Sequence, residues 1–180
     1  MAFPPAHLLV GAGVGELVRI PARLSRWHAW AAGAGFALLP DADTILLFAL
    51  GGRAPNHGVY THSLVSVMVV AICVWAFLGP RWTLLAAAAY ISHLLVDLLR
   101  EGTTSVYLLW PFVDEPVPGL YPLFPTIPFE AGGGALGVPP TLYGPSPLER
   151  VLEQTLIGAG FFLAALAFSA IRRRAGRRAR

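Results

Sequence analysis

The chain has 180 residues, of which 56% are hydrophobic and 13% charged, and its mean hydropathy is +0.62. Soluble domains usually carry about 25% charged residues, so this composition excludes an ordinary soluble domain and indicates one integral membrane domain spanning residues 1–180. The net charge of +3 comes from arginine alone, and six of the thirteen arginines lie in the last nine residues, which is typical of a cytoplasmic topology anchor and not of a nucleic-acid surface.

Apolar segments along the chain predict an all-α membrane bundle of four or five transmembrane helices. A span needs about 20 apolar residues. The first candidate is short and glycine-rich, so it could span, re-enter or lie at the interface. The second is interrupted at Pro40, where we expect a broken helix in which Asp41 or Asp43 caps the second half. In order, the candidates are residues 7–20, 29–50, 64–78, 82–99 and 155–171.

The distribution of arginine orients these segments, because basic residues favour the cytoplasmic side. Placing the C-terminal tail, residues 172–180, in the cytoplasm puts the segment between the third and fourth strong spans on the outer side. Most of that segment, residues 113–154, is predicted to be an irregular outer loop, because it is rich in proline, glycine and aromatic residues. Such a loop suits the bilayer interface and could cap a site formed by residues 1–112. We expect an inner (plasma) membrane protein that contacts lipid.

Two ionisable residues, His93 and Asp97, lie four apart in an otherwise apolar span. On a helix they share one face. Charged groups inside a membrane are costly, which makes the pair a functional candidate, although a hydrogen-bonded pair that only joins helices is the alternative. Further along the chain, Thr61 could cap the next helix with His62 in its first turn, and His57 lies in the preceding loop.

Imidazole and carboxylate ligands without cysteine suit zinc, or manganese or iron, in a catalytic setting. Cys73 is the single cysteine, so thiolate clusters are excluded. On the orientation above, the polar groups gather towards the outer leaflet. We therefore expect one or two divalent ions there.

The order of these motifs resembles the YdjM-like family of predicted membrane-bound metal-dependent hydrolases. The likeness rests on His7, LPDAD, HGxxTHSL, HLLVDLL and LLWPF, although Gly58 stands where the family pattern has an arginine. The ligand order is also similar, more faintly, to that of zinc phospholipase C and P1 nuclease. These resemblances imply metal ligands at the following positions: His7, Asp43, His62, His93 and Asp97.

The resulting hypothesis is a hydrolase that cleaves a phosphoester, such as a phospholipid or a small molecule, with a metal-activated water. Asp41 would take a proton from the water or orient it, and His57 would protonate the leaving group. The main alternative is a non-enzymatic protein that binds or transports a metal or another ion. A transporter would need ligands distributed across the bilayer, whereas these gather near one side.

Overall fold

The structure is a computed structural model, and it describes residues 4–18, 25–42, 44, 58–99, 106–119 and 147–178. These residues form helices joined by turns and short irregular segments, without a β-strand among them, so the predicted all-α class is confirmed for this part of the chain. In chain order the elements are α1 (Pro4–Val18), α2 (Arg26–Leu38), the 3-10 helix η1 (Leu39–Asp41), α4 (Leu64–Leu78), α5 (Pro80–Leu98) and α6 (Pro147–Arg178).

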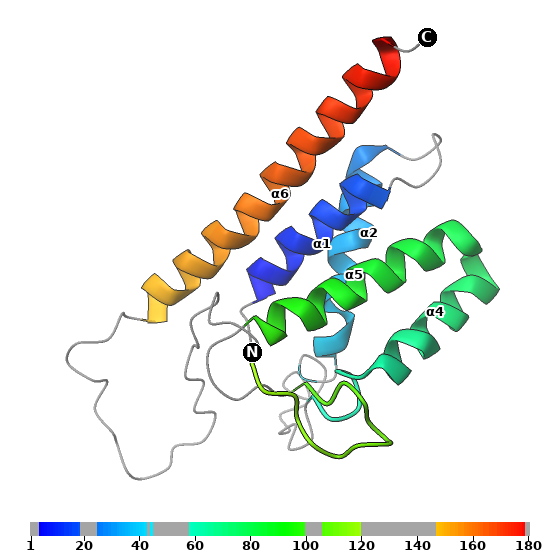
Figure 1. Ribbon diagram of the computed structural model, residues 1–180, viewed down its shortest axis with the longest axis vertical. Helices are drawn as coiled ribbons and strands as arrows, with labels where there is room; N and C mark the ends of the chain where they lie inside the picture. Colours follow the sequence, from blue (N-terminus) through cyan, green and yellow to red (C-terminus); the bar gives the residue numbers. More distant parts are fainter. Residues whose placement is uncertain are drawn as a thin grey trace.

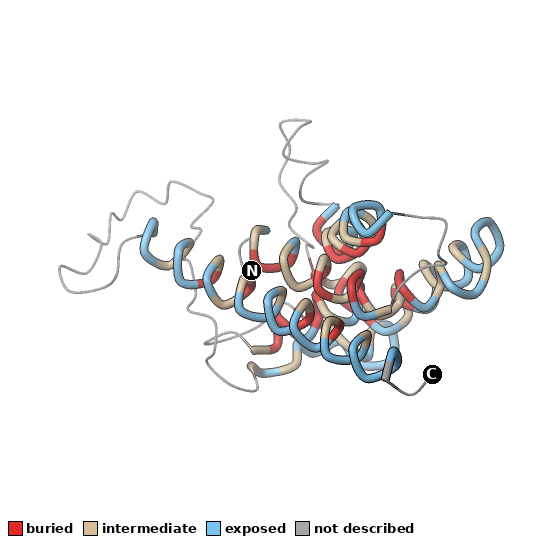
Figure 2. The backbone as a smooth tube through the Cα atoms, turned by 90° about the horizontal axis from the view of Figure 1, so that it is seen from above, coloured by how far each residue is buried: buried red, intermediate tan, exposed pale blue. Residues whose placement is uncertain are grey.

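Helix α1 is the centre of the arrangement, because it packs against α2, α5 and α6 (Figure 1). Helices α4 and α5 form an antiparallel hairpin around Gly79, whose φ of +83° lies in the left-handed region that favours glycine. Figure 2 shows the buried residues at the middle of the bundle, while the long C-terminal helix is mostly exposed. The polar site described below lies within this central packing.

Glycine allows α1 and α2 to approach until their backbones touch. A Cβ atom added at Gly15 would lie 2.1 Å from the carbonyl oxygen of Ala29, and one added at Gly33 would lie 2.2 Å from the carbonyl oxygen of Gly11. Both obstacles are backbone atoms, which cannot rotate away as a side chain could. Small residues at helix contacts are a common means of close packing in membranes.

Replacing Gly15 by alanine is therefore expected to destabilise the protein by about 3 kcal/mol or more, the upper end of the range for overpacking, because α1 and α2 must separate. Gly35 is the matched control, since a Cβ there would meet nothing within 4 Å. Gly35→Ala should leave the protein unchanged or slightly more stable, because alanine favours a helix. Thermal unfolding in detergent measures the stability of both variants. Equal unfolding midpoints for Gly15→Ala and Gly35→Ala would contradict the close contact of α1 and α2.

The predicted helix bounds agree best with those of the structure in the α4–α5 hairpin. Helix α4 covers the predicted 64–78, and α5 begins two residues early at Pro80, a residue well suited to the first turn of a helix. Helix α4 is capped by Ser63, whose Oγ accepts a hydrogen bond from the Ser66 backbone N–H at 3.2 Å. The expectation that Thr61 caps this helix is wrong, and His62 lies just before the helix.

The C-terminal region departs from the predicted boundaries. Helix α6 begins at Pro147, so the irregular segment predicted for 113–154 ends earlier, and the helix continues to Arg178 through most of the predicted tail, 172–180. The segment Glu149–Glu153 carries three charged residues and so falls outside the apolar stretch, yet charged residues with good helix propensity continue a helix readily.

Among the described residues, one helix is long and apolar enough to cross a membrane: Leu148–Arg177 of α6. Helix α4 is apolar but shorter. That the chain has four or five membrane spans stays a prediction. The second predicted segment is indeed broken near Pro40, where α2 gives way to η1, whereas the remainder of residues 29–50 lies largely outside the described part.

Candidate metal centre

Helix α5 provides two of the site residues one turn apart, as the spacing predicts. His93 is fully buried and Asp97 is 4% exposed. The His93 Nε2 atom lies 3.4 Å from Asp97 Oδ2, so imidazole and carboxylate point to the same place. Burial of such groups is costly without partners, and the neighbouring elements supply them.

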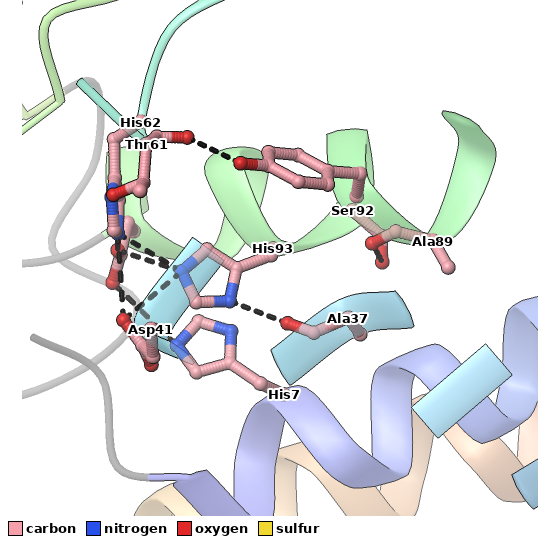
Figure 3. Close-up of polar contacts among 10 residues, drawn as sticks. His7, Ala37, Asp41, Thr61, His62, Ala89, Ser92 and His93 are labelled. Atoms are coloured by element: carbon pink, nitrogen blue, oxygen red, sulfur yellow. Dashed lines mark hydrogen bonds and ion pairs between the residues drawn. The ribbon is translucent and has the colours of Figure 1, made fainter. Parts of the chain in front are cut away.

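Three other elements bring side chains to this point. His7 comes from the second turn of α1, Asp41 from η1, and His62 from the turn that precedes α4. All three are buried. Figure 3 shows these side chains converging with His93 on a common region. The break at Pro40 matters here, because it ends α2 where the Asp41 carboxylate can reach both His62 and His93.

The donor atoms are spaced as ligands of one small cation would be. His62 Nε2, His93 Nε2 and Asp97 Oδ2 are separated by 3.1, 3.2 and 3.4 Å. Bond lengths of about 2.0–2.2 Å in a tetrahedral zinc site place ligand atoms about 3.3–3.6 Å apart. Asp41 Oδ1 lies close to two of these three atoms, 3.5 Å from His62 Nε2 and 3.6 Å from His93 Nε2.

Hydrogen bonds on the far side of each ring fix which nitrogen faces this region. His93 Nδ1 lies 2.6 Å from the Ala37 carbonyl oxygen, which can only accept, so Nδ1 carries the proton and neutral His93 presents the lone pair of Nε2. His62 Nδ1 lies 3.0 Å from Thr61 Oγ1, and Tyr90 Oη donates to the Thr61 carbonyl at 2.6 Å. Such outer partners orient metal-binding histidines.

His7 lies at the edge of the cluster. Its ring stacks on that of His93 with centroids 3.8 Å apart, and its Nε2 lies 3.6 Å from Asp97 Oδ1. Neither ring nitrogen has a hydrogen-bond partner in the described part of the chain, although both are buried. A buried imidazole without hydrogen bonds is suited to bind a metal ion or a substrate.

Two overlapping sets of residues could hold a metal ion: His62, His93 and Asp97, and His7, Asp41 and His93. His93 belongs to both and has only Nε2 to offer, because Nδ1 is bonded to Ala37. The described residues thus provide one complete set at a time. The distances of the first set match a single ion more closely.

The charge around His62, which lies between two predicted spans, favours its protonated form. Burial alone would lower the pKa of His62, but hydrogen bonds to Asp41 and Asp97 and their negative charges raise it to about 9. A metal ion binds the unprotonated ring, so it must displace this proton.

Zinc affinity is therefore expected to rise about tenfold per pH unit between pH 6.5 and 8.5, and to level off as the pH passes the raised pKa of His62. With a histidine of ordinary pKa, near 6.5, the rise would level off by about pH 7.5. Competition with a chromophoric chelator at several pH values measures this. An affinity that stays constant above pH 7.5 would contradict the raised pKa.

Of the seven residues singled out by the sequence, the structure brings five together: His7, Asp41, His62, His93 and Asp97. Asp43 and His57 lie outside the described residues. The supporting roles of Tyr90 and the Ala37 carbonyl were not predicted. The role of Tyr90 could have been suspected from its position three residues before His93, on the same side of the helix. The role of the Ala37 carbonyl could not, because a backbone carbonyl has no signature in the sequence.

Comparison with known proteins identifies the family of the chain. The profile of the YdjM inner membrane protein family matches residues 1–176. The chain belongs to the YdjM inner membrane protein family. It is thus a membrane protein, as its composition predicts. Inner membrane protein YbcI of Escherichia coli (strain K12) is 39% identical over 120 residues, which are 60% of this chain and 64% of that relative. No solved structure matches the chain.

Proposed function

We propose that this member of the YdjM family is a metal-dependent hydrolase that cleaves a phosphoester at the membrane. The observation that carries the proposal is the triangle formed by His62, His93 and Asp97, with donor atoms 3.1–3.4 Å apart and buried. Lone pairs and carboxylate oxygens repel at such distances unless a cation or protons lie between them. The chemistry of the donors suits zinc best, with manganese or iron as alternatives.

Three protein ligands leave one position open, which distinguishes catalytic zinc sites from structural ones. When bound there, a divalent ion would supply a water whose pKa is lowered towards neutrality. Asp41 lies beside two of the ligands, 3.5 Å from His62 Nε2 and 3.6 Å from His93 Nε2, and is the residue we assign to accept the proton of the attacking water. Asp43, which the sequence favours as the ligand, is not needed to complete this set.

The remaining proton transfer requires a group that can give a proton to the leaving oxygen. His57 is the predicted donor and lies outside the described residues. Among the described residues, His7 is placed for this role, because its imidazole touches Asp97 and His93 and keeps both nitrogens unbonded within the described part. The alternative role of His7 is that of a metal ligand, as the resemblances of the sequence imply.

The two ends of the molecule support an orientation in the membrane. The site residues lie where α1 begins and α5 ends, whereas the basic end of α6 lies at the opposite extreme of the molecule (Figure 1). Because arginine clusters favour the cytoplasm, we propose that the C-terminus is cytoplasmic and that the site faces the outer side. Lipid would then be the nearest source of phosphoesters.

A second candidate function is metal binding or transport without catalysis. The burial of all five site residues, at most 5% exposed, favours it, since a substrate needs access to the metal. A closed site in which Asp41 completes four ligands would be of this kind.

The test of hydrolysis uses the purified full chain in detergent, loaded with zinc or manganese. Bis-p-nitrophenyl phosphate and a fluorescent phosphatidylglycerol are the substrates. We expect metal-dependent release of product that is lost in Asp97→Asn and retained in His28→Ala, which alters an exposed histidine of α2. Metal retention without turnover of either substrate would favour the binding protein over the hydrolase.

A further inference from the structure

A second buried polar cluster joins three helices on the side of α1 away from the metal centre. Glu16, near the end of α1, is only 2% exposed. Its carboxylate accepts hydrogen bonds from Arg26 Nε and Nη2 at 3.2 and 3.1 Å, from Arg173 Nη1 at 3.2 Å and from Trp30 Nε1 at 2.9 Å. The carboxylate therefore holds one guanidinium of α2 and one of α6 side by side.

The charges of this cluster do not cancel. Two guanidinium groups share one carboxylate, which leaves one net positive charge. The side chains of Arg26 and Arg173 remain 51% and 31% exposed, whereas that of Glu16 is inside. A guanidinium has five N–H donors, of which Arg26 uses two and Arg173 one on Glu16. The outward donors of both groups are thus available to an anion, and their fork geometry matches a phosphate.

The residues around this cluster are of the types expected at the level of lipid headgroups. Arg173 lies near the end of the apolar stretch of α6, and its neighbours Arg172, Arg174 and Arg177 are exposed. Trp27 is 73% exposed and packs edge-on against Trp30, with centroids 4.8 Å apart. Exposed tryptophan beside arginine is the pattern of a membrane–water interface.

We propose that Arg26 and Arg173, held by Glu16, bind the phosphate of an anionic lipid headgroup. The buried carboxylate fixes the distance between the two guanidinium groups, which distinguishes this site from the diffuse attraction of a basic tail. The site lies away from the His and Asp cluster and does not depend on the metal.

The experiment measures the thermal unfolding midpoint of the full chain in a neutral detergent. Phosphatidylglycerol, phosphatidylcholine with the same acyl chains, and inorganic phosphate are titrated separately. Phosphatidylglycerol is expected to raise the midpoint, and the double variant Arg26→Gln, Arg173→Gln should need at least ten times more of it for the same rise. The matched control is Arg174→Gln, Arg177→Gln, which removes the same charge from exposed positions of α6 and should respond as the wild type does.

Three results would overturn the proposal: an equal response to phosphatidylcholine, an equal loss in the matched control, or an equal rise with inorganic phosphate at the same concentration. The last would assign the site to free phosphate. If the double variant does not fold because Glu16 is left unpaired, adding Glu16→Gln removes the buried charge. The triple variant should then show the same tenfold weaker response, and a wild-type response from it would contradict the site.

Discussion

His93→Ala is expected to lower zinc affinity at least about a thousandfold, because it removes one of three ligands and leaves a gap in a buried site. Both candidate ligand sets lose a member in this variant, since His93 belongs to each of them. The loss should appear as zinc absent from the protein after gel filtration, and as a weakened competition against a chelator.

The control for this variant is His28→Ala. His28 is also a histidine, but it lies on an exposed turn of α2, where its Nδ1 contacts Ser25 Oγ at 2.7 Å. Zinc binding by His28→Ala should equal that of the wild type. Helical content by circular dichroism shows whether His93→Ala remains folded. A folded His93→Ala protein that binds zinc as tightly as the wild type would rule out the assigned ligands.

Asp41→Asn is expected to keep the metal and to lose hydrolysis by about 10²–10⁴-fold, the contribution typical of a general base. Asparagine retains the shape of aspartate and can still hydrogen-bond, but it cannot accept a proton from water. The measurement pairs zinc content with the rate of phosphodiester cleavage on the same preparation.

The same variant separates the two candidate functions. If Asp41 is the fourth ligand of a closed site, Asp41→Asn should release zinc, with an affinity lower by about a hundredfold or more, because a buried carboxylate is lost from the set. Zinc lost from Asp41→Asn together with no turnover in the wild type would therefore favour the non-enzymatic binding protein. Zinc retained with turnover abolished supports the hydrolase.

The sequence predicted local features of this protein well. The i, i+4 spacing of His93 and Asp97 placed both on one face of α5, and the proline at position 40 correctly marked the end of α2. All five residues that meet in the site carry an ionisable group in or beside an apolar segment, where its cost makes it conspicuous. His7 was identified by its place in the motif order, since a single histidine near the start of a chain carries little information.

Choices between neighbouring positions were harder to make from sequence. Asp41 and Asp43 both follow Pro40; the structure places the Asp41 carboxylate beside the histidines, whereas Asp43 lies outside the described residues. Thr61 and Ser63 are both capable caps, and the backbone angles of the turn assign Ser63 to that role. Helix bounds at α6 extended beyond the apolar residues because polar residues continue a helix without leaving a hydrophobic signal.

Contacts between helices outside the site could not be predicted from the sequence. Nothing near Glu16 in the sequence indicates its partners, yet it is buried and Arg26 and Arg173 reach it from two other helices. The glycines of α1 likewise gave no indication that α2 touches them. Such pairings depend on how helices meet in space, which periodicity within one helix does not encode.

The most direct test of the metal centre is X-ray absorption at the zinc edge on the full chain loaded with one equivalent of zinc. The assignment predicts a first shell of nitrogen and oxygen at about 2.0–2.1 Å without sulfur, and outer-shell scattering from two imidazoles, those of His62 and His93. A zinc ion without imidazole scattering, or a protein that does not retain zinc, would contradict the centre proposed for this chain.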